Sequence, residues 1–245
     1  ASNTMLIDEG ATIDVQKSVE GLEARLIHQV GGTITVKSSD DGLNAKDWTL
    51  ESSEAQRPGQ QTKTVKAEAA NAKNLDQAGD VKIVIDGGTL TVDAEGDGLD
   101  ANGSIEINGG TVVVNGPTSG ANAALDYDNN AKLNGGTVLF VDNGGMTMGF
   151  GSDSSQAFLM ASVQGAAGAT VEVVDSSGKT VASLKASKSF STVLISSPEI
   201  KEGEKYTIKV GSNSTTATAS KQATNVGGGP GGGGRPGQGG RPGGR

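Results

Sequence analysis

Apolar and polar residues alternate along the first part of the chain behind a repeated Gly-Gly-Thr triplet. The triplet occurs four times and opens the runs Thr33-Ile34-Thr35-Val36, Thr89-Leu90-Thr91-Val92, Thr111-Val112-Val113-Val114 and Thr137-Val138-Leu139-Phe140. The second and fourth residues of each run are apolar, so each run predicts a strand that buries one face.

Two further short runs accompany the triplet. Runs with apolar outer residues precede three copies, at Ile83-Val84-Ile85, Ile105-Glu106-Ile107 and Ala131-Lys132-Leu133, and Gly-Leu motifs follow at Asp41–Ala45 and Asp97–Ala101, with looser versions at Glu20–Ala24 and Ala123–Tyr127. Equivalent residues lie 21 to 26 positions apart. A coil of this length with three short strands predicts an all-β, right-handed parallel β-helix, in which every strand pairs with its equivalent one coil later. An antiparallel sandwich is the alternative, but Asn-Gly hairpin turns do not recur between the runs.

The repeat fails in two places. Gln29 falls where the equivalent residues are apolar and point inward, so either the first coil is distorted or Gln29 lies at an open end. From about residue 46 to residue 80 the repeat is lost, which predicts a long surface excursion within a parallel domain of residues 1–145.

A different pattern follows at residues 146–226. Runs at 170–174, 180–184, 192–195 and 206–210 predict strands, with a turn at Asp175-Ser176-Ser177-Gly178. We interpret this segment as a small β-rich cap that covers the last strand edges. Residues 227–245 are almost entirely Gly, Pro, Arg and Gln, and we expect this tail to be disordered.

Composition excludes several function classes. With no cysteine, the chain forms no disulfide or thiolate metal site. The net charge is −8, and residues 227–245 carry three arginines and no acid, so the remainder carries −11, which argues against a nucleic-acid partner. No run approaches the roughly 20 apolar residues of a membrane span, and we expect any signal peptide to have been removed.

Acidic and amide side chains cluster beside the Gly-Leu motifs. They are Asp40, Asp41 and Asn44; Glu95, Asp97, Asp100 and Asn102; Asp126, Asp128, Asn129 and Asn130; and, earlier in the chain, Glu20 and Glu23. Stacked coils would bring several carboxylates to one edge, where a hard cation such as Ca²⁺ would balance their charge. Asp and Asn also form turns, but one per turn suffices and here two or three cluster. We therefore predict Ca²⁺ with Asp40, Asp41, Asn44, Glu95, Asp97, Asp100 and Asp126 as ligands.

Other candidates are isolated residues. The only histidine, His28, aligns with outward positions, and we expect it on the surface rather than in a zinc site or a catalytic triad. The only tryptophan, Trp48, either stacks on a sugar ring or anchors the excursion. We expect Phe140, Phe150 and Phe158 to pack in the core or the cap.

The order of motifs resembles a known family. Gly96–Asp100, Asn102–Ile105, Gly116-Pro117-Thr118, Leu125–Asp128, Gly135-Gly136-Thr137, Gly144-Gly145-Met146, Pro198 and Gly203–Thr207 are similar to stretches of the bacterial extracellular carbohydrate-binding domain-containing proteins. That resemblance covers most of residues 20 to 211. It implies a calcium-binding β-helix related to pectate-lyase-type polysaccharide lyases, an extracellular or cell-surface location, and ligands among Asp40, Asp41, Glu95, Asp97, Asp100 and Asp126. Glu20, Glu23 and Ala123 depart from the family pattern.

Three functions remain open. The favoured one is non-catalytic, calcium-containing binding of an extracellular polysaccharide, either an acidic one such as polygalacturonate or cellulose, with Trp48, Lys46 and Arg57 as ligand-binding candidates. A calcium-dependent lyase would use Lys46 as the base, with Arg57 as the second candidate, but no basic cluster lies in the repeat to hold a polyuronate. The third is a structural surface or matrix protein.

Overall fold

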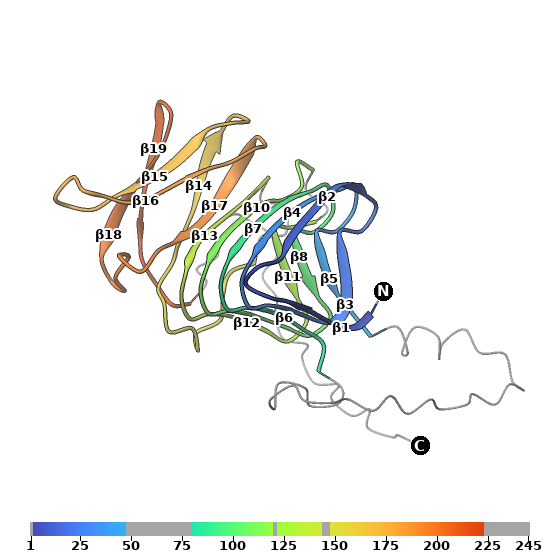
Figure 1. Ribbon diagram of the computed structural model, residues 1–245. Coiled ribbons are helices and arrows are strands. Elements are labelled where there is room, and N and C mark those ends of the chain that lie inside the picture. Colours follow the sequence, from blue (N-terminus) through green and yellow to red (C-terminus); the bar gives the residue numbers. More distant parts are fainter. Residues whose placement is uncertain (1, 48–79, 120–121, 144–147, 223–245) are drawn as a thin grey trace, which may run out of the picture.

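The computed structural model describes residues 2–47, 80–119, 122–143 and 148–222, and every regular element in these ranges is a β-strand (Figure 1). The strands are β1 (Ser2–Ile7), β2 (Thr12–Ser18), β3 (Leu22–Gln29), β4 (Thr33–Ser38), β5 (Leu43–Ala45), β6 (Lys82–Ile85), β7 (Thr89–Ala94), β8 (Leu99–Ala101), β9 (Ser104–Ile107), β10 (Thr111–Asn115), β11 (Leu125–Tyr127), β12 (Asn130–Leu133), β13 (Thr137–Asp142), β14 (Leu159–Gly165), β15 (Thr170–Val174), β16 (Thr180–Lys185), β17 (Phe190–Ser196), β18 (Lys205–Val210) and β19 (Asn213–Thr218). The prediction of an all-β chain is confirmed for these residues.

Strands β1 to β13 pair only in parallel with one another. One sheet has the order β11-β8-β5-β3-β6-β9-β12 with β1 also beside β3, because the long strand β3 pairs with β5 through its first half and with β6 through its second. A second sheet continues β2-β4-β7-β10-β13 in parallel before the antiparallel strands β17 and β14. We call β1 to β13 the parallel stack. The alternative of an antiparallel sandwich is wrong for this part of the chain.

The register of the parallel stack places equivalent residues in columns. Thr33 aligns with Thr89, Thr89 with Thr111, and Thr111 with Thr137, as the Gly-Gly-Thr pattern predicts. The apolar positions that follow each threonine are almost fully buried and share one core with the Leu and Ala residues of the Gly-Leu motifs. The core thus forms because every coil contributes the same inward residues at the same height.

The turn before each threonine requires glycine. The second glycine of each triplet has positive φ, from 73° at Gly32 to 92° at Gly136. At Gly88 an added Cβ would lie 2.4 Å from the carbonyl oxygen of Gly32 on the preceding coil. Both the left-handed backbone and the close approach of the coils therefore exclude larger residues.

A ladder of polar side chains runs beside these turns. Asn108 Nδ2 donates to Asp86 Oδ1 at 2.8 Å, and Asn134 Nδ2 donates to Asn108 Oδ1 at 2.8 Å. His28 Nε2 lies 2.7 Å from the other oxygen of Asp86. Burial raises the pKa of Asp86, but the contacts with Asn108 and His28 outweigh it and hold the pKa below its usual value. The expectation that His28 is a surface residue is wrong: it is only 5% exposed, because Asp86 provides a partner for its ring.

Gln29 is neither displaced nor at the open end of the parallel stack. It aligns with Ile85 on one side and Ile7 on the other, and its side chain is fully buried. The additional strand β1, which sequence analysis missed, covers it. Gln29 Nε2 donates to Thr89 O at 3.3 Å, whereas its Oε1 atom is buried with no hydrogen-bond partner.

The C-terminal strands form an antiparallel layer at the end of the parallel stack opposite β1 and β2 (Figure 1). The order of this sheet is β16-β15-β18-β19, and it packs on β13, β14 and β17 through a second hydrophobic cluster. The four predicted runs all lie within strands, whereas β14 and β19 were not predicted. The predicted turn exists: Gly178 N donates to Asp175 O at 3.1 Å. Phe150 contacts Phe140 and Phe158 edge-on and is fully buried, as expected.

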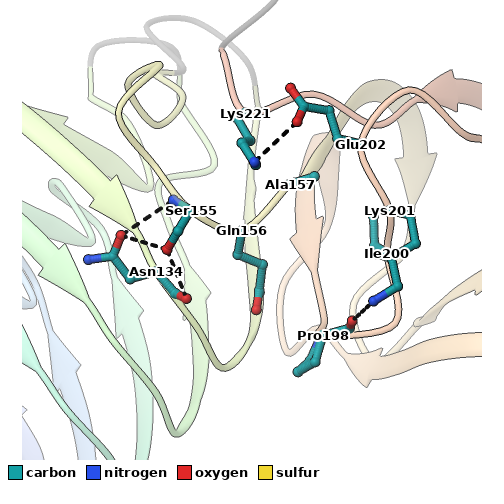
Figure 2. A pocket seen from close by; sticks show the side chains of 9 residues that line it. All are labelled: Asn134, Ser155, Gln156, Ala157, Pro198, Ile200, Lys201, Glu202 and Lys221. Atoms are coloured by element: carbon teal, nitrogen blue, oxygen red, sulfur yellow. Dashed lines mark hydrogen bonds and ion pairs between the residues drawn. The ribbon is translucent and has the colours of Figure 1, made fainter.

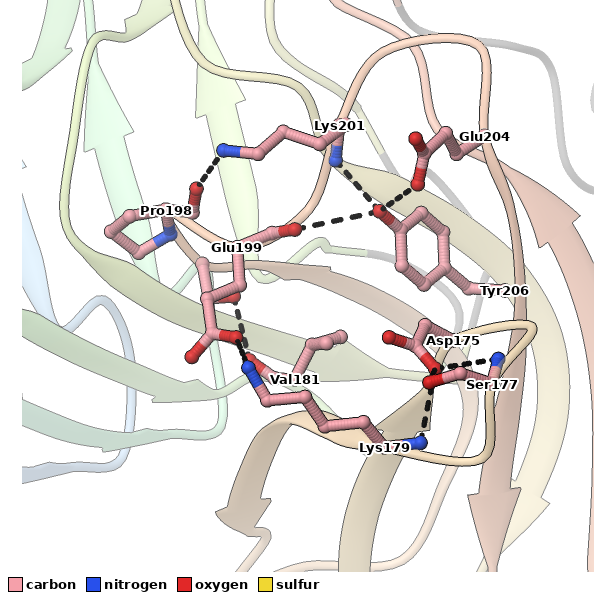
Figure 3. A network of polar contacts seen from close by, with 10 residues as sticks. Asp175, Ser177, Lys179, Val181, Pro198, Glu199, Lys201, Glu204 and Tyr206 are labelled. Atoms are coloured by element: carbon pink, nitrogen blue, oxygen red, sulfur yellow. Dashed lines mark hydrogen bonds and ion pairs between the residues drawn. The ribbon is translucent and has the colours of Figure 1, made fainter.

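A polar network links the turn after β15 to the segment before β18 (Figure 3). Asp175 Oδ1 accepts hydrogen bonds from the amides of Ser177 and Lys179, and the Lys179 ammonium pairs with Glu199. The hydroxyl of Tyr206 accepts from the amide of Lys201 at 2.8 Å. These contacts join the turn after β15 to the segment before β18, so they have a structural role. No helix in the described ranges is long and apolar enough to cross a membrane.

Candidate functional site

Two adjacent columns of acidic and amide side chains lie where the Gly-Leu motifs enter the first sheet. The register of β3, β5, β8 and β11 aligns Glu23, Asn44, Asp100 and Asp126. Three residues earlier in each coil, the same register aligns Glu20, Asp41, Asp97 and Ala123. We call the seven polar members of these columns the acidic edge. Neighbouring coils are about 4.8 Å apart, so carboxylates remote in sequence become neighbours in space.

Hydrogen bonds between coils fix Asp41 and Asp97, the aspartates of the second column. Asp41 Oδ1 accepts from the amide of Asp97 at 2.8 Å, and Asp97 Oδ1 accepts from the amide of Ala123 at 2.6 Å. The second oxygen of Asp41 accepts from Asn44 Nδ2 at 3.2 Å. Each carboxylate is thereby oriented by the backbone of the next coil.

Burial and mutual repulsion disfavour the charged forms of these acids. Burial raises the pKa of Asp97 to about 6; the Ala123 amide opposes this, while Asp41 and Asp126 add to it. For Asp100, burial together with Asp41, Asp97 and other nearby carboxylates raises the pKa to about 7. No cationic side chain is among the principal influences on either group. The acidic edge therefore gathers six acidic side chains, and the nearby ammonium of Lys46 balances only part of their charge.

Two buried oxygen atoms of the acidic edge have no hydrogen-bond partner. They are Asn44 Oδ1 and Glu20 Oε2, and Asn44 as a whole is only 3% exposed. A buried polar oxygen without a donor costs about 1–3 kcal/mol, so such atoms usually have a ligand, an ion or water beside them. Burial, followed by Asp41 and Glu23, also raises the pKa of Glu20. Unpartnered oxygens beside excess negative charge are suited to a hard cation.

Gly96 brings two carboxylates together at the entry to the edge. A Cβ on Gly96 would lie 2.6 Å from Oδ1 of both Asp40 and Asp41, and 2.7 Å from the Asp40 carbonyl carbon. The absence of a side chain therefore lets both carboxylates approach the same turn. Asp40 itself is exposed.

The structure brings most predicted metal ligands together. Asp41, Asn44, Asp97, Asp100 and Asp126 all belong to the acidic edge. Within the described ranges, however, no group of three or more His, Cys, Asp or Glu side chains is already arranged to hold a metal ion. Asp41 and Asp97 are each held by a backbone amide of the next coil, so binding a cation here would require carboxylates to rotate toward one another.

The remaining predicted residues lie elsewhere or have other partners. Glu95 points to the Lys188 ammonium, 3.1 Å away, rather than to the acidic edge. Lys46 Nζ lies 3.6 Å from Glu23 Oε1, at the margin of the edge, and its charge lowers the pKa of Asp41, although burial raises that pKa overall. Trp48 and Arg57 lie outside the described residues.

Among the described residues, two shallow grooves also lie near the parallel stack. One, of about 340 Å³, lies between the turn at Asn134 and the segment from Pro198 to Glu202, and its rim carries the Lys221–Glu202 ion pair (Figure 2). The other, of about 190 Å³, lies over β6, β9 and β12 and includes Lys82, Glu106 and Lys132. Neither contains unpartnered buried polar atoms, so the acidic edge is the stronger candidate.

Comparisons with known proteins add no assignment. No family model, no curated protein and no solved structure matches the chain.

Proposed function

We propose that the chain is a right-handed parallel β-helix that binds Ca²⁺ at the acidic edge and uses it to hold an extracellular polysaccharide without cleaving it. The observation that carries this proposal is the pairing of unbalanced carboxylates, above all Asp97 and Asp100, with the unpartnered buried oxygen of Asn44. An apolar or anionic ligand would leave this combination unexplained.

The helical winding is supported by the pairing of each strand with its equivalent one coil later. Three sets of parallel strands advance in the same order through β3-β4-β5, β6-β7-β8 and β9-β10-β11. Connections between parallel strands are overwhelmingly right-handed, because right-twisted strands pack back on the sheet in that sense. Stacking in register is also what makes columns of identical side chains.

Calcium is the cation that best suits the donors of the acidic edge. It accepts six to eight oxygen ligands at about 2.3–2.6 Å in irregular geometry, from carboxylates, amides and carbonyls. The edge offers carboxylates of Asp97, Asp100 and Asp126 together with the amide oxygen of Asn44. Magnesium demands a stricter octahedron and retains more water.

A bound cation would also explain how an acidic chain could hold an acidic glycan. With a net charge of −8, the protein repels polyuronates unless a divalent ion bridges the two sets of carboxylates. The parallel stack gives a straight, repetitive surface matched to an extended polymer. The resemblance to carbohydrate-binding β-helix proteins supports the same ligand class and an extracellular or cell-surface location.

Retention on polysaccharides tests this function. The full chain, freed of metal, is passed over polygalacturonate gel and over cellulose with calcium or with chelator. We expect calcium-dependent retention of the wild type, and loss of retention for Asp97→Asn/Asp100→Asn. The matched control is Glu172→Gln, which removes an exposed acid on β15 in the C-terminal sheet. Passage of the wild type through both columns in calcium would refute glycan binding and leave the structural role.

The same samples distinguish a binder from a lyase. Cleavage by β-elimination produces an unsaturated sugar that absorbs in the ultraviolet. We expect no rise in absorbance on incubation with polygalacturonate and calcium. A rise that Lys46→Ala abolishes would identify the chain as a calcium-dependent lyase with Lys46 as its base.

A further inference from the structure

A second concentration of oxygen atoms lies where the C-terminal strands touch the parallel stack. The bend between β16 and β17 crosses the ends of β7 and β10. There Ser187 N donates to Asn115 Oδ1 at 2.7 Å, and Ser187 Oγ donates to Asp93 Oδ2 at 3.0 Å. Asn115 is 1% exposed and in turn donates to Val92 O at 3.0 Å. The bend is therefore attached to two successive coils.

The next residue, Lys188, places its ammonium group among four oxygen atoms. Nζ lies 3.0 Å from Asp93 Oδ1, 3.1 Å from Glu95 Oε1, 2.6 Å from Ala94 O and 3.4 Å from Gly116 O. The Lys188 side chain is only 11% exposed. Lysine usually keeps its ammonium group in water, so this burial requires the surrounding oxygens to replace the lost hydration.

The four oxygen atoms around the ammonium are of the types found in cation sites. Two are carboxylates and two are backbone carbonyls, the oxygen types that bind Ca²⁺ in proteins. Their charge of −2 exceeds the single charge of the ammonium. Their distances suit N–H···O bonds. To reach calcium–oxygen distances of about 2.3–2.6 Å, the two carboxylate oxygens would have to move inward by about 0.5 Å and Gly116 O by about 0.9 Å, whereas Ala94 O is already at 2.6 Å.

We propose that Asp93, Ala94, Glu95 and Gly116 form a cation site separate from the acidic edge, which the chain fills with its own Lys188 ammonium. This tethered cation anchors the C-terminal strands on the parallel stack. Because the lysine is covalently attached, the junction stays closed when calcium is withdrawn. The pairing also explains why Glu95, although next to Gly96 and Asp97, does not contribute to the acidic edge.

The test replaces Lys188 and asks whether a free ion takes its place. All variants are made in the Asp97→Asn/Asp100→Asn background, so that calcium binding at the acidic edge, whether it exists or not, does not contribute. Lys188→Ala empties the cage, whereas Lys188→Met removes the charge and still fills the space. Melting temperature and hydrogen exchange of the Ser187 amide are measured without metal and with millimolar calcium.

We expect both variants to melt lower than the parent without metal, by roughly 3–10 °C for loss of a buried charge partner in a chain of this size. Calcium should raise the melting temperature of Lys188→Ala and again protect the Ser187 amide, but should do neither for Lys188→Met or the parent. Equal calcium responses of Lys188→Ala and Lys188→Met, or no loss of stability in either, would overturn the proposal. If Lys188→Ala does not fold without metal, recovery of the folded chain by calcium supports the proposal and failure to recover contradicts it.

Discussion

The metal-free protein should become more stable when the pH falls from about 7.5 to about 5.5, opposite to the response produced by carboxylates whose pKa is lowered on folding. The perturbation is protonation of Asp97 and Asp100. Burial and neighbouring carboxylates raise their pKa values from 3.8 to about 6 and about 7. In the unfolded chain both groups return to ordinary values near 3.9.

The direction follows from proton linkage. Between about pH 4 and pH 7 the folded chain holds more protons on these two groups than the unfolded chain does. The free energy of unfolding therefore decreases as the pH rises through this window, and the repulsion is fully expressed only above the folded-state pKa values. Calcium should remove the effect, because it binds the ionised carboxylates.

The size of the effect is limited by solvent. At about 1.4 kcal/mol per pKa unit, the two raised pKa values correspond at face value to roughly 3 and 4 kcal/mol. Both side chains are only partly buried, and each value includes repulsion by the other group, so the sum overcounts. We expect about 1–2 kcal/mol between the two pH values, or roughly 2–8 °C in melting temperature for a chain of this length.

Thermal melting in metal-depleted buffers at the two pH values measures this difference. The control is Asp97→Asn/Asp100→Asn, which retains every other titratable group, including His28 beside Asp86. Asparagine at position 100 matches Asn44 in the same column, so the substitution is compatible with the fold. We expect the double variant to melt higher than the wild type at about pH 7.5 and to show a much smaller pH response. Equal slopes for the two proteins, or a wild type that is less stable at about pH 5.5, would refute the reasoning.

Three further substitutions probe other parts of the account. Gly96→Ala should lower the free energy of unfolding by about 1–3 kcal/mol in chemical denaturation and weaken calcium-dependent stabilisation, since its Cβ would meet Asp40 and Asp41 at 2.6 Å; unchanged stability would contradict the close approach. Gln29→Leu should raise the free energy of unfolding by about 1 kcal/mol in chemical denaturation, because it removes a fully buried amide with an unpartnered oxygen. Destabilisation would show that the amide oxygen has a hydrogen-bond partner. Phe150→Ala should cost about 3–5 kcal/mol by loss of a fully buried ring between two aromatic neighbours; a loss below about 1 kcal/mol would contradict that packing.

Periodic residues made the parallel stack predictable. The Gly-Gly-Thr and Gly-Leu patterns identify the strands and their register, because an in-register coil repeats the same inward positions and glycine turns. The pattern also identified Asp41, Asn44, Asp97, Asp100 and Asp126 as neighbours. The search for the triplet missed β1 and β2, which lie before its first copy. The alternation of β2 at Thr12-Ile13-Asp14-Val15 nevertheless matches Thr33-Ile34-Thr35-Val36, with which it pairs in register.

Contacts between distant segments could not be read from periodicity. Asp86 pairs with His28, which lies 58 residues earlier in the chain. Lys188, in the bend between β16 and β17, pairs with Asp93, which lies 95 residues earlier. Each depends on how two elements dock rather than on local pattern. For this reason the sequence did not predict the ion pair between Glu95 and Lys188. The one signal in the sequence was a lysine placed on a turn between two strands.

The most direct test of the acidic edge is a crystal structure of the protein grown with calcium, with an anomalous difference map. The account predicts a peak at about 2.3–2.6 Å from carboxylate oxygens of Asp97 and Asp100, and from Asn44 Oδ1 once the side chains have rotated. An ordered acidic edge with no peak at saturating calcium, or with water at those oxygens, would contradict it.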